Sequence, residues 1–203
     1  MIHAMKVHAT PSVLVIMGST RKGRICPKVA AWIADIGRAM IAAPFEIVDL
    51  RDWSLPMDDE PGVPAAGVYE TPHTRSWSEK ITAGRAVVFV TPQYNWGYPA
   101  PLKNALDHLY REWRDKPAII VTYGQRGGAK CAQQLRQVAD GLNMRIVETM
   151  PALKLTRVQI EANDGCVTPE RDFAADLSQV RQAFAELGVL LDAFGADCPT
   201  GPR

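Results

Sequence analysis

The sequence predicts an α/β fold in which a doubly wound, five-stranded parallel sheet carries helices on both faces. Short apolar runs rich in β-branched residues, typical of strands buried on both sides, alternate along the chain with segments of helical periodicity. Parallel neighbours need crossover connections, and this alternation supplies them. The 203 residues, 47% hydrophobic and 22% charged, fit one such domain. We therefore expect a single domain over residues 1–203, with its core at about 12–195 and frayed ends.

Five segments account for the strands. Ser12–Met17, Ala86–Val90 and Ala118–Val121 are continuous apolar runs, expected to be the first, third and fourth strands. Phe45–Leu50 and Arg145–Thr149 are weaker runs, in the right places for the second and fifth strands. Periodicity alone does not separate such short runs from buried helix, so their place in the alternation decides the assignment.

Four segments have apolar residues at spacings of three or four, which predicts amphipathic helices: Val29–Met40, Leu102–Trp113, Ala132–Leu142 and Phe173–Phe194. We expect the last helix to pack against the sheet, and a partner helix is the alternative. Arg51–Trp77 is rich in proline and carries two tryptophans, which indicates a long structured connection around a short helix.

Charge and apolar patterning exclude several classes of protein. With 23 Lys+Arg against 22 Asp+Glu, the net charge is +1. The chain therefore lacks the excess of basic residues that is typical of proteins that bind nucleic acids. No apolar run approaches the roughly 18 residues of a membrane span, and residues 1–11 lack the apolar region of a secretory signal. We expect a cytoplasmic protein with no membrane partner. The cysteines, Cys26, Cys131, Cys166 and Cys198, have neither zinc nor disulfide spacing, so no metal site is predicted.

The turn after the first strand has the features of an anion site. Residues 18–27 run from a glycine into a predicted helix, whose N-terminus offers free backbone N–H groups and a positive dipole end. Ser19 and Thr20 add hydroxyl donors, and Arg21 and Arg24 add cationic ones. The spacing is not that of the dinucleotide fingerprint. A nucleotide-hydrolysing P-loop is also disfavoured, because Arg24 and Ile25 stand where its lysine and hydroxyl residue must be.

Two further turns follow the third and fourth strands. The first, Thr91–Pro101, holds Tyr94, Trp96 and Tyr98 among prolines and a glycine; core packing is the ordinary alternative for such rings. The second, Thr122–Gly128, contains three glycines that permit close approach of the backbone to a ligand.

In the flavodoxin-like strand order 2-1-3-4-5, these three turns lie side by side at the carboxyl ends of adjacent strands, where ligands of such sheets bind. A phosphate pocket next to an aromatic, glycine-lined ring pocket fits a mononucleotide with a large flat base. FMN is therefore the expected ligand.

Three stretches resemble the NADPH-dependent FMN reductase family, which includes flavodoxin-like quinone, chromate and azo-dye reductases: Gly18–Arg24, Pro92–His108 and Tyr123–Gly128. The resemblance implies non-covalent FMN, NADPH or NADH as electron donor, and a small-molecule acceptor such as a quinone, azo dye, flavin or metal oxyanion. It also implies a homodimer or tetramer. Gln93 departs from the family, where many members have glutamate; little consequence is expected if this position chiefly lends its backbone.

By the same resemblance, Ser19, Arg21 and Arg24 hold the phosphate with the N–H groups of Ile25 and Cys26. Pro92–Trp96 border the isoalloxazine, with the Tyr94 and Asn95 amides toward its O4/N5 edge, and Tyr123 and Gly124 approach the other rim. The expected cofactor-binding residues are Ser19, Thr20, Arg21, Arg24, Ile25, Cys26, Pro92, Gln93, Tyr94, Asn95, Trp96, Tyr123, Gly124, Arg126 and Gly127. No side chain is expected to be catalytic, because the flavin performs the chemistry.

Several alternatives stay open. His108 is expected to be a surface or capping histidine rather than an acid or base. Cys26, at a helix N-terminus beside cationic residues, is either a reactive thiol or a small residue that lends its backbone to phosphate. The leading function is an FMN-dependent NAD(P)H oxidoreductase using ping-pong hydride transfer through flavin N5. A flavodoxin-type electron carrier and a flavin-binding interaction protein are the alternatives.

Overall fold

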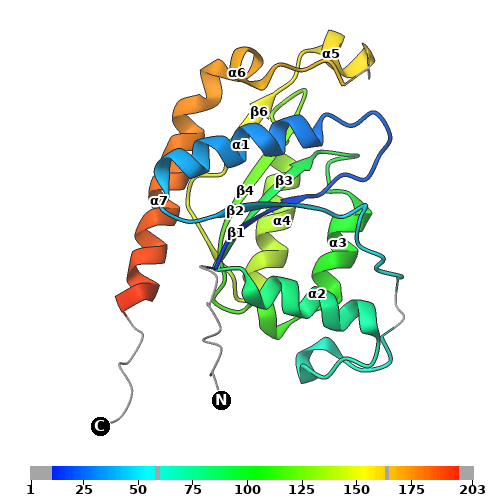
Figure 1. Cartoon of the computed structure of the whole chain (residues 1–203). Helices are drawn as coiled ribbons and strands as arrows, with labels where there is room; N and C mark the ends of the chain where they lie inside the picture. The colour runs from blue at the N-terminus through cyan, green and yellow to red at the C-terminus, as the bar shows by residue number, and fades with distance from the viewer. Residues whose placement is uncertain (1–10, 58–59, 163–164, 197–203) are drawn as a thin grey trace, which may run out of the picture.

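The predicted doubly wound α/β fold is confirmed (Figure 1). The computed structural model describes residues 11–57, 60–162 and 165–196, so the expected frayed ends and most of the residues tested for a secretory signal lie outside the described residues. The parallel sheet has the order β2-β1-β3-β4-β5, with a sixth strand, β6, paired to β4. Among the described helices, none is both long enough and apolar enough to cross a membrane.

The first four strands match the positions of the expected runs, and β2 lies at one edge of the sheet. They are β1 (Val13–Met17), β2 (Phe45–Asp49), β3 (Ala86–Pro92) and β4 (Pro117–Gly124). Val13 of β1 pairs with Phe45 on one side and Ala86 on the other, so the carboxyl ends of these strands meet at one edge of the sheet.

The fifth strand differs from the prediction. Only Arg145–Ile146 forms β5, beside the start of β4, and Ala152–Lys154 forms β6, beside the end of β4. Pro151 lies between the two strands, where its missing N–H and fixed φ oppose a continuous ladder. The sequence prediction extended β5 too far and missed β6.

Alternate residues of the central strands serve two separate cores. Val13 and Val15 face α1 (Cys26–Met40) and α7 (Leu177–Ala196), whereas Leu14 and Ile16 face the opposite layer. That layer consists of α2 (Pro72–Ala83), α3 (Ala100–Asp107) and α4 (Ala129–Gly141), visible below the sheet in Figure 1. The predicted packing of the last helix on the sheet is confirmed for its described side chains, which include the buried Phe184 and Leu187.

Several short helices complete the chain. They are α5 (Arg157–Ala162), α6 (Pro169–Asp172) and the 3-10 helices η1 (Pro64–Ala66), η2 (Arg111–Trp113) and η3 (Ala174–Asp176). Trp113 therefore lies in η2 rather than at the end of α3, and Phe173 lies between α6 and η3, before α7 begins.

His108 corrects one expectation. It occupies the C-cap position of α3, but it is only 5% exposed, so the surface interpretation is wrong. Its Nδ1 lies 2.9 Å from Thr74 Oγ1 and its Nε2 lies 2.9 Å from the carbonyl oxygen of Pro56. The imidazole thus fastens the connection after β2 to α2 and α3, away from the three turns.

Candidate functional site

The three turns singled out in the sequence meet around one cavity of about 710 Å³ at the carboxyl ends of β1, β3 and β4. Its described lining contains arginines but no aspartate or glutamate. The lining residues are Arg21, Gly23, Arg24, Ile25, Pro92, Gln93, Tyr94, Asn95, Trp96, Tyr123, Gly124, Gln125, Arg126, Leu155, Gln159 and Ile160. The expected residues Ser19, Thr20, Cys26 and Gly127 are close in sequence to this lining but are not part of it.

The turn after β1 is held tightly against β3 and opens onto α1. The Gly18 amide donates to the Val90 carbonyl at 2.9 Å, and a Cβ on Gly18 would lie 2.8 Å from Thr91 Oγ1. Gly23, with φ +68°, takes a left-handed conformation that favours glycine. At the start of α1, Pro27 has no amide N–H and the Lys28 and Val29 amides donate to the Ile25 carbonyl, which leaves the Ile25 and Cys26 amides and the positive end of the helix dipole at the turn.

Arg24 is the most informative side chain of the cavity. Its side chain is only 7% exposed, and Nη2 donates to Asp49 Oδ2 at the end of β2. Nε and Nη1 are buried without a hydrogen-bond partner among the described residues. Leaving buried charged donors unsatisfied is costly, so this side chain is suited to an anionic ligand group such as a phosphate.

Ser19 and Cys26 lie beneath the turn rather than in the cavity. The Ser19 hydroxyl is fully buried and lies 2.9 Å from the Tyr94 hydroxyl. The Cys26 thiol is also fully buried and donates to the Val90 carbonyl at 3.4 Å. Burial raises the pKa of Cys26, and the hydrogen bond with Tyr123 and the charge of Arg24 only partly oppose this. The structure thus favours the backbone role for Cys26 over a reactive thiolate.

The aromatic turn after β3 has an unusual backbone. Tyr94 and Gly97 exchange amide-to-carbonyl hydrogen bonds of 2.8 and 2.9 Å, and both residues between them have positive φ: +47° at Asn95 and +71° at Trp96. This is the pattern of a type I′ turn. The Tyr94 amide is therefore not available to a ligand, which corrects the expectation that it points to a flavin edge. Trp96 is 71% exposed at the cavity.

Arg21 and Tyr94 form a stacked pair in the cavity wall. The guanidinium carbon of Arg21 lies 3.9 Å from the centre of the Tyr94 ring. Such cation–π contacts hold an arginine in one orientation while leaving its N–H groups available. Arg21 is exposed, in contrast to Arg24.

The turn after β4 is fastened to the aromatic turn. The Gln93 amide donates to the Tyr123 carbonyl at 3.0 Å, and Gln93 Oε1 accepts from the Cys131 amide in the first turn of α4. Gln93 thus uses its side chain as well as its backbone, which the resemblance did not suggest. Tyr123 lines the cavity but is 3% exposed, and burial with the neighbouring Cys26 raises the pKa of its hydroxyl well above the usual value.

The glycines of this turn are required by its shape. Gly127 has φ +73°, and a Cβ there would lie 2.6 Å from the Ala152 carbonyl oxygen. Gly128 has φ +84° and is the N-cap of α4. Gly127 therefore shapes the turn without lining the cavity, while Gly124 and Arg126 line it.

Comparison with known proteins agrees with these features. Residues 11–154 match the model of the family described as NADPH-dependent FMN reductase. The chain belongs to this family. An NAD(P)H-dependent FMN reductase of Schizosaccharomyces pombe is 50% identical over 186 residues, which cover 91% of this chain and 92% of that protein. A quinone reductase of Escherichia coli is 35% identical over 144 residues, covering 66% of this chain and 72% of the relative.

The members of the FMN reductase family are oxidoreductases. The same fold is found in solved structures of such enzymes. A flavoenzyme NAD(P)H:(acceptor) oxidoreductase from Paracoccus denitrificans has a TM-score of 0.67 at 22% identity, covering 90% of this chain and 98% of the other. At that identity the likeness shows the fold alone.

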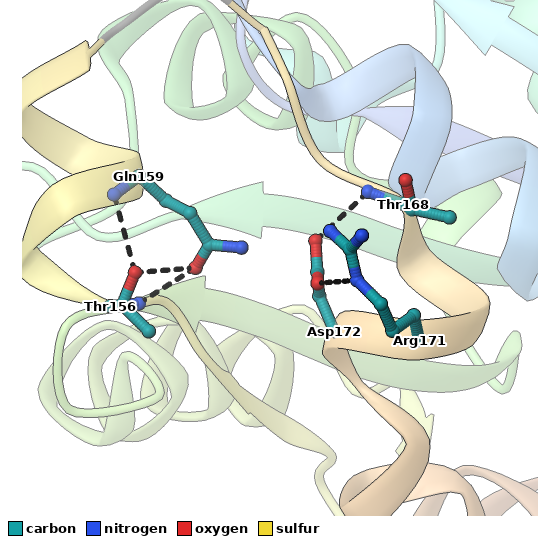
Figure 2. A network of polar contacts seen from close by, with 5 residues as sticks. All are labelled: Thr156, Gln159, Thr168, Arg171 and Asp172. Carbon is teal, nitrogen blue, oxygen red and sulfur yellow. Dashed lines mark hydrogen bonds and ion pairs between the residues drawn. The ribbon is translucent and has the colours of Figure 1, made fainter.

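One wall of the cavity lies beyond the part matched by the FMN reductase family. Leu155 follows β6, and Gln159 and Ile160 come from α5. Thr156 and Gln159 cap this helix reciprocally, because Gln159 Oε1 accepts from the Thr156 amide and hydroxyl while Thr156 Oγ1 accepts from the Gln159 amide (Figure 2). The pattern Thr-x-x-Gln is a capping box, and it could have indicated this helix from sequence.

The segment after α5 is fastened over α1. Lys28 Nζ donates to the Gly165 carbonyl at 2.7 Å. The Thr168 amide, at the N-cap of α6, donates to Asp172 at the end of that helix, and Arg171 pairs with the same carboxylate (Figure 2). The Lys28 contact thus joins the segment between α5 and α6 to α1, while the Asp172 contacts stabilise α6 locally.

Proposed function

We propose that this chain is an FMN-dependent NAD(P)H oxidoreductase that reduces quinones or similar flat acceptors, with azo dyes, flavins and metal oxyanions as further candidates. The observation that carries the proposal is the cavity itself. Its lining contains Arg24, a buried arginine near a helix N-terminus with unpartnered donors, together with an aromatic turn and a glycine-rich turn. These three features follow adjacent strands of the sheet. Relatives named as FMN and quinone reductases support the same chemistry.

The phosphate of FMN fits the turn after β1. We assign it to Arg24, Arg21 and the amides of Ile25 and Cys26, with Thr20 contributing from the same turn and Ser19 supporting that turn from beneath, where its hydroxyl lies 2.9 Å from that of Tyr94. The unpartnered Nε and Nη1 of Arg24 support this assignment, since a phosphate would satisfy both.

The ring system of FMN fits between the second and third turns. Pro92, Gln93, Asn95 and Trp96 would border it on one side, with the Asn95 amide toward its polar edge. The turn after β4 would approach from the other side, through Tyr123, Gly124 and Arg126, with Gly127 setting the shape of that turn. FMN held between these turns would supply ping-pong hydride transfer from NAD(P)H to the acceptor through its N5 position. The protein binds, orients and screens the ring from water.

Steady-state kinetics test this function. FMN-loaded protein should oxidise NADPH or NADH only when a soluble quinone is present, and double-reciprocal plots at several quinone concentrations should be parallel. An electron carrier or an interaction protein would bind FMN but show almost no such turnover. Carriers of that kind usually have strongly acidic docking surfaces, whereas this chain has a net charge of +1.

We further propose that residues 1–203 form one domain that assembles as a homodimer or tetramer in the cytoplasm. The two cores share a single sheet, which supports one domain. Met57, Val63 and Val68 are 69 to 73% exposed on the connection after β2, which supports assembly through that face. The buried thiols of Cys26 and Cys131 fit a reducing compartment. Analytical ultracentrifugation of the FMN-loaded protein tests the assembly state.

A further inference from the structure

Arg24 has more hydrogen-bond donors than its observed contact uses. A guanidinium carries five N–H donors, one on Nε and two on each Nη. The contact with Asp49 uses one of the two donors of Nη2, and the one donor of Nε and the two of Nη1 have no partner among the described residues in this nearly fully buried side chain. Arg24 lines the cavity, so its side chain is close to any anion bound there, and Nε and Nη1 are its donors without a partner among the described residues.

Asp49 is itself held in place. It is the last residue of β2 and pairs in register with Met17, the residue directly before the turn that carries Arg24. Its Oδ1 accepts from the Arg51 amide at 3.0 Å, and its Oδ2 accepts from Arg24. The side chain is 19% exposed. The end of β2 thus holds the Asp49 carboxylate in place, and this carboxylate orients the Arg24 guanidinium.

The pairing also makes the burial of Arg24 possible without a ligand. An unpaired cation in this position would carry a large desolvation cost, which the Asp49 carboxylate offsets. The pair is neutral, so the charge of an incoming phosphate is met mainly by the N-terminus of α1 and by the exposed Arg21 and Lys22. The pair orients the guanidinium, because the three donors on Nε and Nη1 are already desolvated and held in one direction.

We propose that Asp49 is a positioning residue that holds Arg24 for the flavin phosphate and thereby sets the preference of the site for FMN over riboflavin. Asp49 acts through Arg24 and needs no contact with the ligand. This inference rests on the proposed FMN-binding function. It adds a residue from β2, a strand that supplies nothing to the cavity lining itself.

The ratio of the dissociation constants for riboflavin and FMN measures this role, because the two ligands differ only in the phosphate. Asp49→Ala should weaken FMN binding by about 10-fold or more, the loss expected when a charge-assisted contact is misdirected, and should change riboflavin binding less than about twofold. Both constants follow from quenching of flavin fluorescence on titration with FMN-free protein. The readout needs no turnover.

Asp52→Ala is the matched control. It removes the same charge three residues along the chain, from an exposed position outside the described cavity lining, and should leave the ratio unchanged. If Asp49→Ala does not fold, Asp49→Asn keeps one acceptor oxygen without the charge and should lower the ratio by a smaller factor.

Two results would overturn the inference: an unchanged ratio in the Asp49 variants, which includes equal weakening of both flavins, or tighter FMN binding, which would make Asp49 a competitor of the phosphate. A wild-type protein that binds neither flavin would instead refute the proposed function. A wild-type protein that prefers FMN while the Asp49 variants keep that preference would refute only the role of Asp49.

Discussion

At the scale of single residues, Trp96 has a backbone conformation that its bulky side chain disfavours. Its φ of +71° belongs to the left-handed region, where a bulky residue costs about 1 to 2 kcal/mol. The indole is 71% exposed, so burial in the core does not repay that cost. Strain of this kind at a cavity is typical of a residue retained for ligand contact.

Trp96→Gly should therefore stabilise the flavin-free protein by about 1 kcal/mol, because glycine adopts this conformation without strain. It should also raise KM for a flat quinone, since the indole surface is lost. Urea unfolding and steady-state kinetics measure the two effects. Asn95→Gly at the preceding position is the control, and its gain should be smaller because asparagine tolerates positive φ. A destabilised Trp96→Gly protein with unchanged KM would contradict this account.

The two arginines of the phosphate turn should differ in their effect on FMN affinity. Arg24→Ala should weaken FMN binding by more than about 10-fold, since it removes buried charged donors. Arg21→Ala should weaken it only a few-fold, because an exposed cation is screened by solvent. Flavin fluorescence titration measures both. Equal losses would mean that burial of Arg24 is not what gives this site its affinity.

At the scale of elements, α7 tests the two-core packing. Phe184 is 1% exposed and its ring centre lies 5.9 Å from that of Phe45 on β2, edge to face. Phe184→Ala should lower the free energy of unfolding by about 3 to 5 kcal/mol. Val189→Ala, on the same helix but 70% exposed, should change it by less than about 0.5 kcal/mol. Similar losses in the two variants, measured by urea unfolding, would place an unrecognised partner on the outer face of α7.

Some of the elements could be predicted from the sequence and others could not. The strand order and the three cavity-lining turns were predictable, because β1, β3 and β4 are built on continuous apolar runs with distinctive residues at their ends. The separation of the expected fifth strand into β5 and β6 was missed. β6 has only three residues, and its pairing with Thr122–Gly124 depends on the tertiary structure rather than on the local sequence. The capping box at Thr156 could have predicted α5 from the sequence. No sequence pattern indicated that α5 lines the cavity.

Individual contacts were less predictable than elements. Burial of His108 depends on Pro56 and Thr74, which come from distant parts of the chain. The engagement of the Tyr94 amide depends on a turn with positive φ at tryptophan, which residue preference argues against. Asp49 was not singled out because its partner Arg24 is brought to it only by the pairing of β1 with β2.

At the scale of the whole molecule, stability should fall in acid. Burial raises the pKa of Glu186, but hydrogen bonds from the Thr149 hydroxyl and amide outweigh it, so the pKa lies below the ordinary value of 4.5. A carboxyl group whose pKa is lowered by folding contributes stability above its unfolded pKa and loses it as the pH falls through the folded value. The pKa of Asp172 is also lowered, by Arg171 and the Thr168 amide.

Glu186→Gln should thus be less stable than the wild type at about pH 7, and the difference should shrink as the pH drops below about 4.5. Urea unfolding at the two pH values measures it. Glu79→Gln, which removes the same charge from an exposed site on α2, should show no such convergence. A Glu186→Gln deficit that is the same at both pH values would mean that the Glu186 carboxylate does not titrate as described.

The central claim is that one cavity holds FMN and passes electrons from NAD(P)H to a quinone. Anaerobic titration of the FMN-loaded protein tests it most directly. NADPH or NADH should bleach the absorption of oxidised flavin stoichiometrically, and a soluble quinone added afterwards should restore it without oxygen. A flavin that stays oxidised with both donors, or a reduced flavin that the quinone does not reoxidise, would contradict the account.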